Sequence, residues 1–76
     1  MSDKTLPARF GELVRRLRLG AALSQEDLAH AAGLHVTYIS RLERGLRAPS
    51  IVVVDQLAAA LNLKVSELMA KLEQDG

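Results

Sequence analysis

Two short amphipathic segments on either side of Gly33 constrain the fold of this chain more than any other feature of its sequence. Counted from Gln25, the fifth residue is Ala29, which is small enough to lie beneath a second helix that crosses close above it. The ninth residue is Gly33, which suits a turn that requires a positive φ. The other positions that must be apolar in such a pair are Leu28, Ala32, Leu34, Ile39 and Leu42. All seven positions agree, so residues about 25–44 are predicted to form a helix-turn-helix. The alternative is an ordinary pair of helices within a bundle.

The sequence also predicts a helix before this pair and indicates where the two helices of the pair begin and end. A first helix is expected from about Pro7 to Gly20, with an apolar face formed by Phe10, Leu13, Val14 and Leu17. Ser24 suits the N-cap of the second helix, and Asp27 three residues later completes a capping box. The third helix is expected over roughly residues 35–44, with Gly45 just past its end.

Two more helices are expected in residues about 50–73. Pro49 and Ser50 open the fourth helix and Asn62 closes it, with inward positions at Ile51, Val54, Leu57, Ala58 and Leu61. Ser66 opens the fifth, whose apolar positions are Leu68, Met69 and Leu72. Without repeats or a linker, the chain is predicted to be all-α, a compact five-helix bundle forming a single domain over residues 1–76.

Composition excludes several classes of function. The 76 residues include no cysteine, so neither a disulfide framework nor a cysteine zinc site is available. His30 and His35 lie five residues apart and no cysteine accompanies them, so no metal site is expected. The sequence has no cysteine nucleophile, carboxylate pair, metal-ligand cluster or phosphate-binding glycine loop, so neither an enzyme nor a cofactor is expected. The longest apolar run has four residues, far fewer than the roughly 20 needed to span a bilayer. Because the N-terminus is also polar, we expect a cytoplasmic protein.

Charge is distributed unevenly along the chain. Residues 1–47 hold eight Lys and Arg against five acids, a net of +3, whereas residues 48–76 hold two against four, a net of −2. This asymmetry suits a molecule with one face toward a polyanion, although ordinary surface variation produces the same pattern.

Several segments together resemble one known family. They are Ser24–Ala29, Gly33–Leu34, Thr37–Ser40 and Glu43–Gly45. From about Phe10 to Leu68 the chain resembles the Cro/repressor-type, or xenobiotic-response-element, helix-turn-helix family, which implies a lambda-repressor-like DNA-binding domain. Residues 33–47 are most similar to the stand-alone controller proteins of restriction–modification systems, which are dimeric transcription regulators.

The resemblance implies a role for each exposed residue of the third helix, because that helix enters the major groove in this family. The residues implied to read base edges are Val36, Thr37, Ser40 and Arg41, of which Arg41 is the candidate for a bidentate contact with guanine. The residues implied to bind phosphates are Gln25, Tyr38, Arg44 and Arg47.

Some residues near the predicted interface have a second possible role or differ from the family pattern. The Tyr38 ring can instead pack on the protein, and Glu43 is expected to be structural, paired with an arginine or bonded near its helix end. The arginines that can assist from the first helix are Arg15, Arg16 and Arg18. His35 stands where the family often has a capping hydroxyl, and Val36 where long polar side chains are frequent.

A dimer is expected, because a single module of this kind binds DNA weakly. The residues predicted to form its interface are Val52, Val53, Leu63, Met69 and Leu72. The alternative is that Met69 and Leu72 only complete the monomer's core. The predicted function is a homodimeric, sequence-specific transcriptional regulator on a pseudo-palindromic operator, with double-stranded DNA and RNA polymerase as partners. The alternative is an antitoxin-type protein-interaction module.

Overall fold

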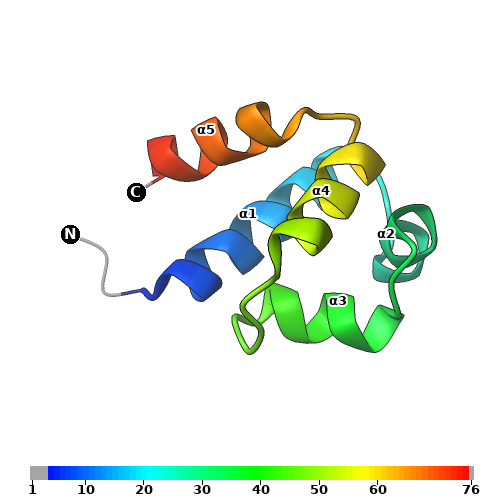
Figure 1. The fold of residues 1–76 in the computed structure, drawn as a ribbon. Coiled ribbons are helices and arrows are strands. Elements are labelled where there is room, and N and C mark those ends of the chain that lie inside the picture. The colour runs from blue at the N-terminus through cyan, green and yellow to red at the C-terminus, as the bar shows by residue number, and fades with distance from the viewer. Residues whose placement is uncertain (1–3, 76) are drawn as a thin grey trace.

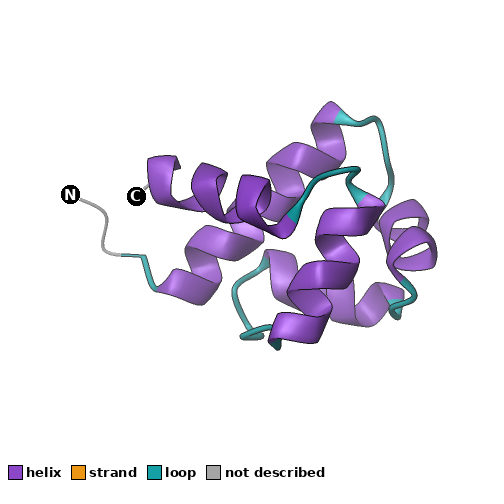
Figure 2. Cartoon of the chain, turned by 45° about the horizontal axis from the view of Figure 1, so that its top comes forward, coloured by secondary structure: helices purple, strands orange, loops and turns teal. Residues whose placement is uncertain are grey.

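The computed structural model describes residues 4–75, and within that range every regular element is a helix (Figures 1 and 2). Helix α1 spans Leu6–Gly20, α2 Gln25–Ala32, α3 Val36–Glu43, α4 Ile51–Ala60 and α5 Val65–Asp75. Helix α1 packs against α3 on one side and α5 on the other, while α4 packs against α2 and α5 (Figure 1). The prediction of an all-α fold with five helices is confirmed.

Side-chain caps set the starts of most helices. The Ser24 hydroxyl accepts from the Asp27 backbone N–H and the Asp27 carboxylate accepts from the Ser24 N–H, each at 3.0 Å, so the predicted capping box is complete. Ser50 caps α4 as expected, with its hydroxyl accepting from the backbone N–H of Val53. His35 precedes α3 without a side-chain cap hydrogen bond, in agreement with the weak cap expected there.

The start of α5 differs from the prediction by one residue. The helix begins at Val65 and not at Ser66. The Glu67 carboxylate accepts a hydrogen bond of 2.8 Å from the backbone N–H of Lys64, which places the cap at Lys64. The serine therefore lies inside the helix, and the glutamate three residues after Lys64 provides the cap.

Residues with positive φ follow the ends of four helices. Gly33 (φ 70°) and Gly45 (φ 76°) adopt this conformation after α2 and α3, as their positions indicated. Asn62 (φ 60°) does so after α4. Ala22 (φ 58°) occupies the equivalent place after α1, although its Cβ makes the left-handed region unfavourable.

The core lies between the five helices. Its fully buried members include Val14 of α1, Leu28 of α2, Leu57 of α4 and Leu68 of α5. The inward position predicted for Ile51 is wrong, because its side chain is 81% exposed. Cβ atoms in a helix tilt toward its N-terminus, so the side chain of the first residue of α4 points past the end of the helix into solvent.

Within residues 4–75, no helix has the length and hydropathy needed to cross a membrane. No group of three or more potential ligand side chains that could hold a metal ion is gathered in the same range.

Candidate nucleic-acid interface

The turn between α2 and α3 fixes the angle at which α3 is presented. The Leu34 backbone N–H donates to the Ala29 carbonyl at 2.9 Å, across a turn that Gly33 enters with positive φ. Ala29 is 4% exposed, and the side chains of Ile39 and Leu42 on α3 are fully buried. These contacts hold the inner side of α3 against the core, so its outer side faces solvent in a fixed orientation.

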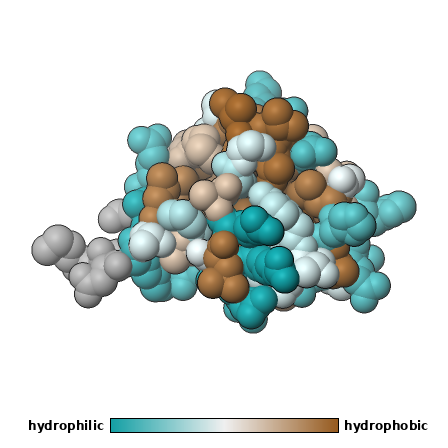
Figure 3. All heavy atoms as spheres, turned by 60° about the horizontal axis from the view of Figure 1, so that its bottom comes forward, coloured by the Kyte–Doolittle hydropathy of each residue, from teal (hydrophilic) through white to brown (hydrophobic). Residues whose placement is uncertain are grey.

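The outer side of α3 carries most of the residues predicted to read bases. Val36, Thr37 and Arg41 are exposed, whereas Ser40 is half-buried. Thr37 and Arg41 lie one helical turn apart and therefore share a face. Figure 3 views the molecule from the side of α3 and shows hydrophilic side chains near the middle of this face, with hydrophobic ones beside them. The structure thus brings the four residues together on one short helix.

The residues predicted to bind phosphates are placed less uniformly. Arg44 and Arg47 are exposed at the end of α3 and in the loop that follows it. The Arg44 Nε donates to the Ser40 carbonyl at 3.4 Å, so its side chain lies along the helix. Tyr38 is half-buried and packs against the core, as its second interpretation described. Gln25 is half-buried at the first position of α2.

A buried ion pair joins α1 to the end of α3. Arg18 Nε donates to Glu43 Oε2 at 2.7 Å, and Arg18 Nη2 donates to Glu43 Oε1 at 3.0 Å. Each residue is 7% exposed. The hydrogen bond with Glu43 raises the pKa of Arg18; burial opposes this shift and the carboxylate charge adds to it, so Arg18 stays protonated.

This pair decides which of the arginines singled out on α1 are exposed at the surface. The structural role expected for Glu43 matches its geometry, whereas Arg18 is withdrawn from the surface. The burial of Arg18 could be predicted from helical spacing, because Arg18 lies four residues after buried Val14 and shares its side of the helix. Arg16 is exposed and pairs with Asp75 at the end of α5, and Arg15 is exposed.

The residues predicted to form a dimer interface lie on α4, on α5 and between them. Val52 is 64% exposed, whereas Val53, Leu63 and Met69 are half-buried and pack against the core. Leu72 is 8% exposed and belongs to the core, which is the alternative stated for it.

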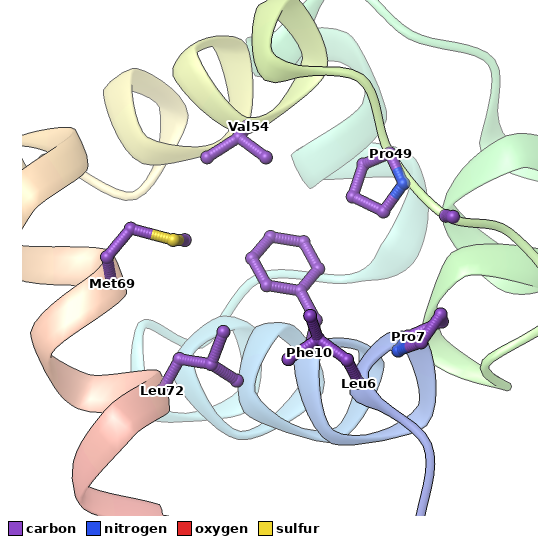
Figure 4. Close-up of a pocket in the computed structure, with 8 residues that line it drawn as sticks. Leu6, Pro7, Phe10, Pro49, Val54, Met69 and Leu72 are labelled. Atoms are coloured by element: carbon purple, nitrogen blue, oxygen red, sulfur yellow. The ribbon is translucent and has the colours of Figure 1, made fainter.

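An apolar cavity of about 200 Å³ opens beside these residues. The side chains of Phe10, Val54, Met69 and Leu72 converge on it from α1, α4 and α5 (Figure 4). Exposed Ile51 lies on the same first turn of α4 as Val54. Helical spacing alone predicts neither the cavity nor the exposure of Ile51.

Residues 14–68 match the helix-turn-helix family, and the chain belongs to it. Its relatives in this family are HTH-type transcriptional regulators, several of them control proteins. Control protein C.BamHI of Bacillus amyloliquefaciens is 41% identical over 61 residues, which cover 79% of this chain and 75% of the relative.

Solved structures of controller proteins are also similar to this chain. The restriction–modification controller protein C.AhdI of Aeromonas hydrophila is 42% identical, with a TM-score of 0.78 over 82% of this chain and 94% of that one. Controller protein C.Esp1396I is 26% identical, with a TM-score of 0.87 over 95% of each chain, in a structure of its tetramer with its natural 35-base-pair operator.

Proposed function

We propose that this protein is a sequence-specific DNA-binding transcriptional regulator of the controller type. The outer side of α3 is the observation that carries the proposal. Val36, Thr37 and Arg41 stand exposed on a helix whose other side is fully buried. Such a helix fits the major groove, where short side chains admit it and a guanidinium can bond two atoms of guanine.

Charge and the neighbouring elements support the same orientation. Arg44 and Arg47 continue from α3 toward the start of α4, where they would meet phosphates flanking the groove. Glu43, the acid on this segment, is buried against Arg18 and so presents no exposed carboxylate to the duplex. The operator-bound structure of C.Esp1396I makes operator DNA the favoured ligand class.

The functional unit is a homodimer on a pseudo-palindromic operator. Val52 and Ile51 are exposed at the start of α4, and Met69 and Leu72 line the apolar cavity. Exposed apolar side chains and an apolar hollow on one molecule are suited to a symmetric contact. Two such modules about 34 Å apart would read half-sites one helical turn apart. Bound near a promoter in the cytoplasm, the dimer would block or recruit RNA polymerase and would serve as the controller of a restriction–modification system.

Selection of bound duplexes from a random DNA pool tests the proposal. The expected result is enrichment of two inverted half-sites with a fixed spacing. Enrichment of a single unrepeated site would contradict the dimer but keep the DNA-reading role. A pool that remains random at low ionic strength would overturn the proposal and leave the protein-interaction alternative.

A further inference from the structure

Gln25 at the start of α2 and Glu43 at the end of α3 are joined by a hydrogen bond between their side chains. Gln25 Nε2 donates to Glu43 Oε1 at 3.1 Å, across a separation of 18 residues in sequence. The same carboxylate accepts two hydrogen bonds from Arg18, whose Nη1 also donates to the Leu23 carbonyl at 2.9 Å. The group therefore ties α1, the entry to α2 and the end of α3 together.

The carboxylate determines which way the Gln25 amide faces. An ionised carboxylate only accepts hydrogen bonds, so the NH₂ group of Gln25, and not its carbonyl, must point toward Glu43. The NH₂ group has two N–H bonds, and Glu43 takes one of them. A DNA phosphate also only accepts, and the second N–H remains to bond it.

We propose that Glu43, held by Arg18, is a positioning residue that orients the Gln25 amide so that its second N–H is offered to a DNA phosphate. This inference rests on the proposed function, in which Gln25 contacts the backbone. Arg18 neutralises the carboxylate, so the orienting acid does not repel the phosphate it serves.

The proposal and simple charge counting give opposite expectations for Glu43→Gln. Removing a negative charge from a protein that binds a polyanion should tighten binding. Loss of the orienting acceptor should instead weaken it, because the new amide allows the Gln25 amide to face either way. Glu26→Gln removes the same charge from the exposed first turn of α2 and leaves the Gln25 contact intact, so it is the matched control.

The experiment is a double-mutant cycle on affinity for a duplex selected by the wild-type protein, with folding of each variant checked by circular dichroism. Gln25→Ala should weaken binding to all sequences about three- to tenfold without lowering the salt slope, since one neutral hydrogen bond is lost. Glu43→Gln should weaken it by a similar factor, and should have no further effect in the Gln25→Ala background. Glu26→Gln should bind equally or more tightly.

Glu43→Gln leaves Arg18 buried without a counter-charge, so that variant can unfold. If it does, the paired change Arg18→Met with Glu43→Leu replaces the ion pair by apolar side chains and enters the same cycle. Binding of the Glu43 variants at wild-type strength, or additive effects with Gln25→Ala, would overturn the positioning role while the proposed function stands. If the wild-type protein selects no duplex, both fail.

Discussion

At the scale of single residues, Arg41 and Arg47 carry the same charge but are expected to affect DNA binding differently. Arg41→Ala should relax the preference at one base pair of each half-site, with a loss of roughly 1–3 kcal/mol on the preferred base. Arg47→Ala should weaken all sequences alike and reduce the salt slope by about one. Affinities for singly substituted operators over a range of salt concentrations separate the two effects.

Lys71→Ala serves as the control for these variants, because it removes the same charge from the exposed side of α5. It should leave base preference unchanged. An Arg41→Ala variant whose base preferences equal those of the Lys71→Ala variant would show that Arg41 does not read the groove.

Ala22 gives a second prediction at this scale, which concerns stability. Its φ of 58° is unfavourable for a residue with a Cβ, so Ala22→Gly should raise the free energy of unfolding by roughly 0.5–1 kcal/mol. Neighbouring Ala21 is also exposed but has a φ of −91°, so Ala21→Gly should lower the stability. Urea denaturation measures both variants, and equal effects of the two changes would contradict the explanation.

At the scale of elements, the cap of α2 makes stability depend on pH. Hydrogen bonds from the backbone N–H and hydroxyl of Ser24 hold the pKa of Asp27 below its usual range. Because the pKa is lower in the folded state, the stabilisation is present above the unfolded-state value of about 4 and is lost as pH falls through the folded value. Asp27→Asn should therefore reduce the decrease in the free energy of unfolding at acidic pH, which urea denaturation measures. A decrease that is unchanged by Asp27→Asn would contradict this role of the cap.

The contact between α1 and α3 depends on the absence of a side chain at Gly11. A Cβ there would collide with the Leu42 carbonyl and lie 2.9 Å from the Glu43 carbonyl oxygen. Gly11→Ala should thus reduce the stability by at least about 2 kcal/mol, since backbone must move. Gly20 ends the same helix with open space around it, and Gly20→Ala should raise the stability by roughly 0.5 kcal/mol. Thermal unfolding compares the two, and a mild effect at Gly11 would mean that the helices separate easily.

At the scale of the whole molecule, the proposed dimer predicts that stability depends on concentration. A chain of this length buries only about 60% of its unfolded surface, so association would add needed stability. Val52→Lys places a charge on an exposed position of α4 and should give a monomer that binds the operator at least tenfold more weakly. Sedimentation at micromolar concentration and operator titration measure both effects.

Leu19→Lys is the control, because Leu19 is also exposed and apolar but lies near the end of α1. It should sediment like the wild-type protein. Sedimentation of the wild-type protein as an 8.3 kDa monomer at micromolar concentration would count against the dimer.

The sequence by itself determined the features that depend on local spacing. Ala29 and Gly33 specified the turn, Ser24 with Asp27 specified a cap, and the exposed residues of α3 followed from the period of the helix. Each of these features depends on a few residues that are close together in the sequence, so it can be predicted without knowledge of the tertiary structure. For the same reason, the family could be recognised from short segments.

Only the tertiary structure decided what happens where elements from distant parts of the chain meet. It withdrew Arg18 to pair with Glu43, engaged Gln25 with the same carboxylate, and left Ile51 in solvent at the edge of the core. Helical periodicity gives the direction of a side chain around its own axis but not the partner opposite it or the point where the core ends. Those depend on how the helices pack, because burial and ion pairing are properties of the assembled molecule.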